Sequence, residues 1–138
     1  MKSTEIRKPR PLSPPGFALV MEADADLRAT ICSALLLDGH RVESVADCAG
    51  VLAVRAVAPA PDDLLLALGA AKVDPDWDQL RLALDEDAVL SRMAVIVLLT
   101  IRNGLTFPER ARIVQKPFDI DRLLALVASD MAASRGLV

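Results

Sequence analysis

Tyrosine is absent from this sequence, and histidine and cysteine are scarce. The single histidine, His40, argues against a zinc centre and against a histidine-based catalytic triad. The two cysteines, Cys32 and Cys48, lack the spacing of a CxxC pair. The sequence leaves a disulfide between them open, but free thiols in a reducing, cytoplasmic compartment are the better expectation.

Long apolar runs and a strong net charge are also missing. The longest strongly apolar run, Met93 to Leu99, is far too short to span a bilayer. The formal net charge is -3, so nothing in the overall charge favours nucleic acid or an anionic membrane as a partner. Apolar side chains, in contrast, make up 53% of the 138 residues, which predicts one globular domain with a substantial core.

The first sixteen residues differ in composition from the rest. They are rich in proline and carry four basic residues against one acidic residue, without the apolar stretch of a secretory signal. A flexible arm is expected, either a disordered tail or a docking segment. The predicted organisation is a Pro-rich basic arm (1–16), one domain (17–131) and a C-terminal tail (132–138).

Five short segments are typical of strands, and three of them have the unbroken apolar character of strands buried on both faces of a sheet. The predicted strands are Phe17–Met21, Arg41–Val45, Asp63–Leu68, Ala94–Leu99 and Arg112–Gln115.

Helical patterns fill most of the intervals between these strands. Trp77, at helical spacing with Leu80 and Leu84, is interpreted as a residue that packs a helix on the sheet. Gly104 and Pro108 allow only a short or irregular fourth helix between Arg102 and Arg110. The first predicted helix has Asp24 or Asp26 as its N-cap and ends at Gly39, and the second has Asp47 as its N-cap and ends at about Val57. The third has Asp74 as its N-cap and Pro75 at the first helical position. The last helix begins after Asp119 as its N-cap.

Strands alternating with helices predict an α/β fold. The order βαβαβαβαβα favours a doubly wound sheet of five parallel strands with right-handed crossovers. A flavodoxin-like domain with strand order 2-1-3-4-5 fits the length.

Three segments then carry a resemblance to a known family. They are Leu19–Arg28 with its acidic turn, Pro61–Leu68, and Lys116–Asp119 with its Lys-Pro-Phe turn. Over roughly residues 17–129 the chain resembles the receiver domain of bacterial two-component response regulators.

The resemblance implies a site for phosphoryl transfer to an aspartate. In the family an acidic pair binds Mg²⁺, and a Ser or Thr and a lysine hold the aspartyl phosphate. Here Ala67 stands where the aspartate would be, Ala23 replaces one acidic residue, and the hydroxyl position falls on Leu99 unless a one-residue shift brings in Thr100. The degenerate pocket comprises Glu22, Ala23, Asp24, Ala67, Leu99, Thr100 and Lys116.

These departures from the family pattern are expected to remove the phosphoryl-transfer chemistry. A methyl group cannot form an acyl phosphate, and one carboxylate is a poor Mg²⁺ site, so Mg²⁺ binding is expected to be weak or absent. Asp62 and Asp63 cannot substitute, because they lie at the opposite end of their strand, roughly 13–17 Å away. Ile113 stands where the family has an aromatic rotamer switch.

The leading interpretation is a pseudo-receiver, a receiver fold that acts as a protein-binding regulator or adaptor without phosphorylation. Its expected partner is a signalling protein, namely a kinase, a phosphotransferase or another regulator, and it is expected to be a monomer or a homodimer.

Two alternative functions belong to other classes of protein, namely a ligand sensor and an enzyme. A sensor of a nucleotide second messenger such as cyclic di-GMP would use Arg102, Arg110 and Arg112 to bind phosphates. An enzyme is disfavoured, because the pocket offers no nucleophile–base pair. We expect Lys116 to form an ion pair with Glu22 instead.

Overall fold

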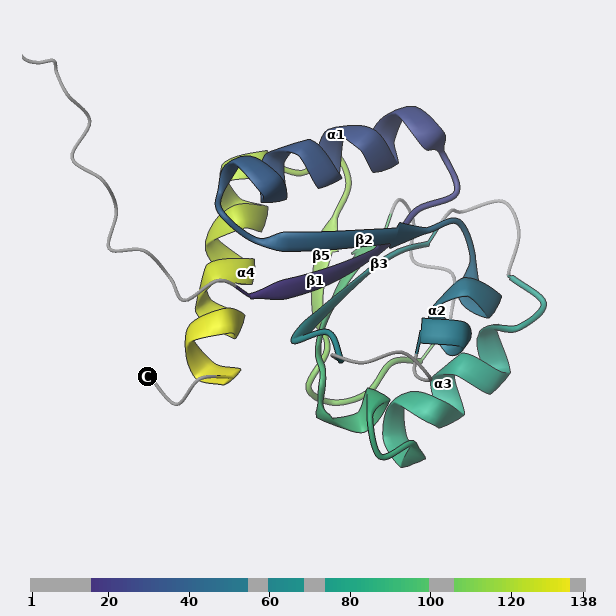
Figure 1. Cartoon of the computed structure of the whole chain (residues 1–138). Coiled ribbons are helices and arrows are strands. Elements are labelled where there is room, and N and C mark those ends of the chain that lie inside the picture. Colours follow the sequence, from purple (N-terminus) through teal and green to yellow (C-terminus); the bar gives the residue numbers. More distant parts are fainter. Residues whose placement is uncertain (1–15, 55–59, 69–73, 100–105, 135–138) are drawn as a thin grey trace, which may run out of the picture.

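The computed structural model describes residues 16–54, 60–68, 74–99 and 106–134. These residues form a parallel sheet in the order β2-β1-β3-β4-β5, with helices on both faces (Figure 1). No helix among them is long and apolar enough to cross a membrane. The strands are β1 (Phe17–Met21), β2 (Arg41–Val45), β3 (Asp63–Leu68), β4 (Ala94–Leu99) and β5 (Arg112–Gln115), and the helices are α1 (Ala25–Leu37), α2 (Cys48–Val54), α3 (Trp77–Glu86), the 3-10 helix η1 (Leu90–Arg92) and α4 (Ile120–Ser134).

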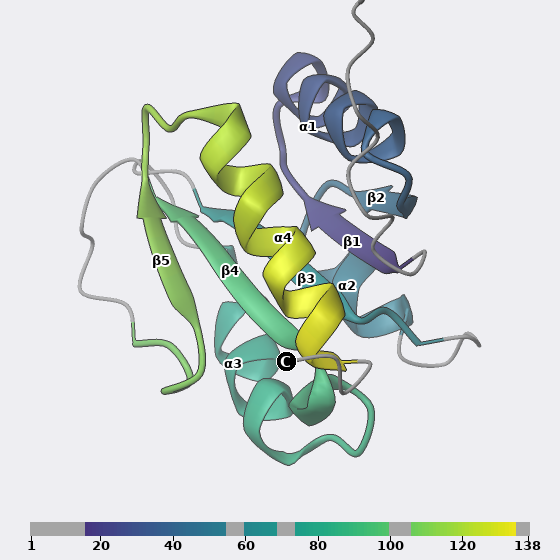
Figure 2. The ribbon, with the colours of Figure 1, turned by 90° about the vertical axis from the view of Figure 1, so that its left-hand side faces the viewer.

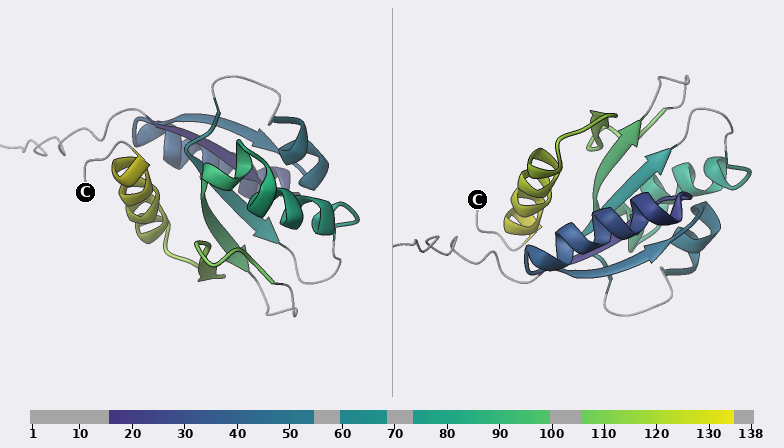
Figure 3. Two further views of the ribbon diagram at one scale, coloured as in Figure 1. Left: turned by 90° about the horizontal axis from the view of Figure 1, so that it is seen from below. Right: turned by 90° about the horizontal axis from the view of Figure 1, so that it is seen from above.

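The predicted strands and their order are thus confirmed. The chain is an α/β protein with a doubly wound sheet, because the order reverses between β1 and β3 and the helices divide between the faces. In Figure 3, α1 lies in front of the sheet in the view from above, and α3 lies in front in the view from below. Helix α4 lies beside α1 on the same face (Figure 2).

Strand β3 separates two apolar clusters. Side chains alternate between the faces of a strand, so Leu64, Leu66 and Leu68 join the cluster under α2 and α3. Leu65 and Ala67 join the cluster under α1 and α4. All six residues of β3 are buried, which explains why the sequence of this strand shows no polar alternation.

Aspartates begin the helices that flank this sheet. The Asp24 carboxylate accepts hydrogen bonds from the backbone N–H groups of Asp26 and Leu27, so Asp24 is the N-cap of α1. Asp47 accepts a bond from Gly50 N–H in α2, and Asp119 accepts one from Asp121 N–H in α4. These caps confirm three predicted helix starts.

The predicted start of the third helix is wrong. Helix α3 begins at Trp77, two residues later than expected, and Pro75 lies in a turn before it. The Asp74 carboxylate accepts hydrogen bonds from Asp76 N–H at 2.8 Å and from Cys48 N–H at 3.0 Å. Asp74 therefore closes the turn before α3 and also binds the first N–H of α2, a long-range contact that sequence periodicity does not reveal.

The connection from β4 to β5 is described only in part. Residues 106–111 contain a turn and no helix, and the rest of the predicted short fourth helix lies outside the described residues. Phe107 from this connection packs edge-to-face on Trp77, with ring centroids 5.6 Å apart. Trp77 is 3% exposed, which confirms its interpretation as a packing residue.

Gly50 in α2 offers a test of this packing. A Cβ on Gly50 would lie 2.7 Å from Val45 Cβ, in a stiff β-branched side chain of β2. Alanine would gain about 0.5–1 kcal/mol in helix propensity, but overpacking costs about 1–3 kcal/mol. We expect Gly50→Ala to lower the free energy of unfolding by about 1–2 kcal/mol in urea titrations. The same change in a Val45→Ala background should cost much less, and an equal cost would rule out this clash as the cause.

Candidate functional site

The candidate site lies where the strands end. In the register of the sheet Met21 pairs with Leu66 and Leu99 pairs with Gln115, so the residues that follow β1 and β5 reach the same edge as the end of β3. This edge carries Glu22 directly after β1, Ala67 as the second-to-last residue of β3, and Lys116 directly after β5. Parallel α/β sheets use this edge to bind ligands.

Glu22 is the centre of the site. It is only 6% exposed, and its carboxylate makes two contacts: Oε1 lies 3.2 Å from Lys116 Nζ, and Oε2 accepts a hydrogen bond from Asp24 N–H at 3.0 Å. Its backbone is held as well, because the carbonyl oxygen accepts a 2.7 Å bond from Arg28 Nη1 and the N–H donates to Val45 O. The carboxylate is therefore oriented inward and neutralised by a lysine.

Lys116 is positioned by its backbone bond to β4. Its N–H donates to Leu99 O at 2.6 Å, which continues the β4–β5 ladder by one residue. The Lys116–Pro117 peptide bond is cis. The side chain is 17% exposed and reaches back to Glu22, so the expected ion pair is present.

Among the described residues, the other predicted acidic and hydroxyl positions contribute no side-chain contact to this pair. Asp24 uses Oδ1 to cap α1 and is exposed to solvent. Ala23 is exposed and has no polar side-chain atom. Leu99 is a buried residue of the apolar cluster under α3, and Thr100 lies outside the described residues.

Ala67 occupies the position where the resemblance implies a nucleophile. Its methyl group is 5% exposed and belongs to the apolar cluster under α1 and α4, together with Leu65 and Leu98. The end of β3 is therefore apolar, and no carboxylate of β3 lies at this edge. Asp62 and Asp63 lie at the amino end of the strand, where Asp62 accepts a bond from Phe17 N–H.

The donor set does not fit the Mg²⁺ ion that receiver domains use. Glu22 is bonded to Lys116 and to a backbone N–H, Asp24 caps a helix, and the side chains of Ala23 and Ala67 have no donor atoms. Within the described ranges, no three His, Cys, Asp or Glu side chains come together in a way that could hold a metal ion. Weak Mg²⁺ binding remains a prediction.

The arginines proposed for phosphate binding contact the protein itself. Arg110 donates from Nε to Met93 O at 2.8 Å and from Nη2 to Leu90 O at 2.9 Å. Arg112 forms an ion pair with Asp130 and donates to Leu126 O. Arg102 lies outside the described residues. Two of the three guanidinium groups are thus engaged, and the structure lends the nucleotide-sensor alternative no support.

The cysteines offer no alternative nucleophile at this edge. Both are free thiols, as expected. Cys48 is buried at the start of α2, where burial first and the carboxylate of Asp74 second raise the pKa of its thiol to about 12. A thiol that stays protonated at neutral pH is a packing group.

One cavity beside the site was missed by sequence reasoning. It has a volume of about 310 Å³ and lies between α1 and the chain that joins β5 to α4. Leu27, Ile31 and Phe118 form much of its apolar lining, and Lys116 closes one side. Only the packing of α1 against the Lys-Pro-Phe turn creates this cavity, so no local pattern in the sequence could have predicted it.

Known structures identify this arrangement. The chain is similar to a response regulator receiver protein from Sinorhizobium medicae WSM419, with 21% identity and a TM-score of 0.68 over 87% of this chain and 97% of that one. The signal receiver domain of a signal transduction histidine kinase from Syntrophus aciditrophicus aligns with 17% identity and a TM-score of 0.72, covering 86% and 91%. The receiver domain of the Francisella response regulator 1452 gives 17% and 0.68, covering 86% and 98%.

The fold is that of a response regulator receiver domain. No protein-family model matches the sequence, and no curated protein matches it. The receiver fold is therefore present in a sequence that is only 17–21% identical to these structural neighbours. At the carboxyl edge of the sheet this receiver fold carries a lysine–glutamate ion pair and a buried alanine.

The ion pair can be tested by removing its cation. Lys116→Met leaves the buried Glu22 carboxylate without its partner, and breaking a buried pair in this way costs about 3–5 kcal/mol. We expect a loss of about 2–4 kcal/mol in the free energy of unfolding, measured by urea denaturation, because Lys116 retains some solvent access. The double variant Glu22→Gln/Lys116→Met should recover most of this loss.

The matched control is the pair Arg81–Asp85 on the surface of α3. Asp85 has a side chain that is 47% exposed, so Asp85→Asn should cost less than about 1 kcal/mol. A Lys116→Met cost as small as that of the control would show that the Glu22–Lys116 pair contributes little.

Proposed function

We propose that this chain is a signalling protein of the two-component type that binds its partner without being phosphorylated. The similarity of its fold to solved receiver domains supports a signalling role. The observation that carries the proposal is the state of the carboxyl edge: the nucleophile position is a buried methyl group, and the one buried carboxylate is paired with Lys116.

The chemistry of the edge supports this proposal. An acyl phosphate needs a carboxylate oxygen as its acceptor, and Ala67 has none. In receiver domains the lysine is expected to contact the phosphoryl group, whereas here Lys116 is bonded to Glu22. The ion pair therefore joins the residues that follow β1 and β5 and requires no added ligand.

The proposed role is that of a protein-binding regulator or adaptor, not of an enzyme. Its partner would be a kinase, a phosphotransferase or another regulator in the cytoplasm, and the protein would act as a monomer or homodimer. A switch requires two populated states. A receiver fold that is held in one state is therefore better suited to a scaffold, which would be controlled through its concentration or through its partner.

Phosphorylation is the direct test. After incubation with Mg²⁺ and acetyl phosphate, we expect intact-mass spectrometry to detect no phosphoryl adduct, and beryllofluoride to leave the amide NMR spectrum unchanged, because the acceptor oxygen is missing. A receiver domain with an intact aspartate serves as the positive control. A stable adduct on the wild-type chain would contradict the proposal.

The variant Ala67→Asp separates the effect of the missing acceptor oxygen from the effect of the missing metal ligand. It restores an acceptor oxygen, but Ala23 still withholds a metal ligand, so we expect little phosphorylation. Ala23→Asp/Ala67→Asp should be phosphorylated more readily than Ala67→Asp. Efficient phosphorylation of the single variant would show that the metal site is better than its side chains indicate.

Partner binding should not depend on a phosphoryl donor. Using the full chain as bait in a native cytoplasmic extract, we expect the same bound protein with and without acetyl phosphate, quantified by mass spectrometry. Bait lacking residues 1–16 tests the basic arm in parallel. A partner that is captured only in the presence of the donor would overturn phosphorylation-independent binding.

A further inference from the structure

Asp63, at the amino end of β3, is a buried acid that the carboxyl edge does not use. Its side chain has no exposed surface, and both carboxyl oxygens lack a hydrogen-bond partner within the part of the chain that the structure describes. By the alternation of β3 it lies on the same face as Leu65 and Ala67, the face that α1 and α4 cover. A buried carboxyl without partners is costly, so its position calls for an explanation.

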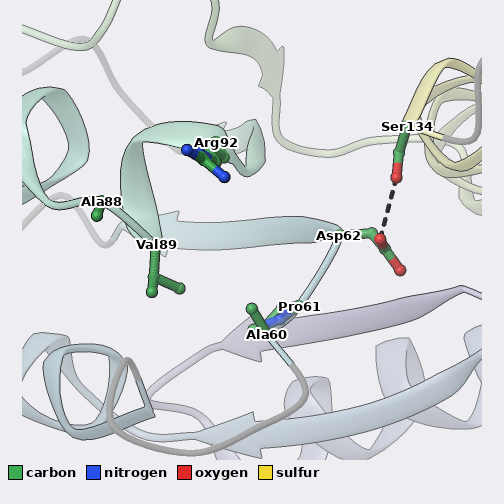
Figure 4. Close-up of a pocket in the computed structure, with 7 residues that line it drawn as sticks. All are labelled: Ala60, Pro61, Asp62, Ala88, Val89, Arg92 and Ser134. Atoms are coloured by element: carbon green, nitrogen blue, oxygen red, sulfur yellow. Dashed lines mark hydrogen bonds between the residues drawn. The ribbon is translucent and has the colours of Figure 1, made fainter.

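The groups around Asp63 fasten the end of α4 to the sheet. Arg112 of β5 forms an ion pair with Asp130 and donates to Leu126 O at 3.1 Å, both in α4. One turn further on, Ser134 Oγ donates to Asp62 Oδ1 at 3.0 Å (Figure 4). Leu126, Asp130 and Ser134 are spaced four residues apart, so these contacts follow one face of the helix.

An ionised Asp63 would have to share its cation. Arg112 is the cation that acts on Asp63, and it is already paired with Asp130. The carboxylate of Asp62, next to Asp63 in the chain, also disfavours a charge on Asp63, and the residues beside Asp63 in β1 and β4 are Ala18 and Ala94. A negative charge on Asp63 would therefore compete with Asp130 for the Arg112 guanidinium.

The cost of that charge appears in the titration of Asp63. Burial, and to a lesser extent Asp62, raises the pKa of the Asp63 carboxyl well above its usual range, and Arg112 only partly opposes this rise. The folded protein therefore holds a proton that the solvated side chain would release at roughly pH 4.

We propose that Asp63 is a proton-dependent latch for helix α4. In its protonated form Asp63 allows the last two turns of α4 to pack over the sheet with the Arg112–Asp130 and Ser134–Asp62 contacts intact. Loss of the proton to solvent leaves a buried carboxylate that competes with Asp130 for Arg112, and the end of α4 lifts so that water can reach the charge. The latch lies at the opposite edge from Glu22 and Lys116 and is independent of the function proposed for that edge.

The direction of the pH effect follows from linkage. Asp63 is protonated when α4 is closed and ionised when α4 is open, so opening releases one proton at any pH between the two pKa values. In that window the equilibrium constant for opening rises about tenfold for each unit of increasing pH. Above the pKa of the closed form the constant becomes independent of pH.

Amide hydrogen exchange of the full chain, followed by NMR between pH 5 and pH 9, tests the latch. After correction for intrinsic exchange rates, we expect the protection of amides 126–134 to fall about tenfold per pH unit below the pKa of Asp63, which carboxyl ¹³C shifts report directly. In Asp63→Asn this slope should vanish. Asp63→Val serves the same purpose if the amide is poorly tolerated.

The controls distinguish the latch from general unfolding. Asp78→Asn removes an exposed carboxylate from the first turn of α3 and should keep the wild-type slope. The amides of α3 pack on the other face of the sheet and should remain more protected than those of α4. The proposal is overturned if Asp63 titrates near pH 4, if Asp63→Asn keeps the slope, or if α3 and α4 lose protection together with equal magnitude.

Discussion

The constraint on which the structure depends is the burial of β3 on both faces. Helices α2 and α3 cover one face and α1 and α4 the other, so each of the six residues of this strand is removed from water. A strand in this position can carry polar groups cheaply only at its ends, where neighbouring loops can pair with them. The two ends of β3 differ in this respect. Ala67 keeps the carboxyl end apolar, whereas Asp63 places a buried acid at the amino end.

At the carboxyl end, the missing aspartate changes the balance of charge in the whole edge. In a receiver site with several carboxylates, a metal ion offsets their mutual repulsion. Here one buried carboxylate, Glu22, faces one lysine, and the charges cancel without a metal. The receiver fold is thus present around a site whose side chains offer neither a phosphoryl acceptor nor a set of metal ligands. The binding role proposed above is compatible with such a site, since binding requires a shape and not a reaction.

Much of the fold could be predicted from local patterns. Unbroken apolar runs located the central strands, and aspartates at the N-caps of α1, α2 and α4 located the helix starts. The rule that an aspartate marks the N-cap failed at Asp74. Its carboxylate closes the turn before α3 and binds Cys48 N–H, a long-range contact that a local pattern does not reveal. Arg110 and Arg112 show the same limit. Their sequence clustering suggested a surface for anions, yet one holds the carbonyl groups before β4 and the other pairs with Asp130 in α4.

The sequence by itself determined the order of the elements, the doubly wound sheet and the absence of an acceptor oxygen at position 67, because these depend on residue type and spacing along the chain. Only the tertiary structure decided which charges meet. It brought Lys116 to Glu22 across the ends of β1 and β5, and it enclosed Asp63 under α4 without a hydrogen-bond partner within the described residues. The physical reason is that an electrostatic contact depends on distance and burial in space, and residues far apart in sequence acquire both only when the sheet is assembled and its helices are packed on it.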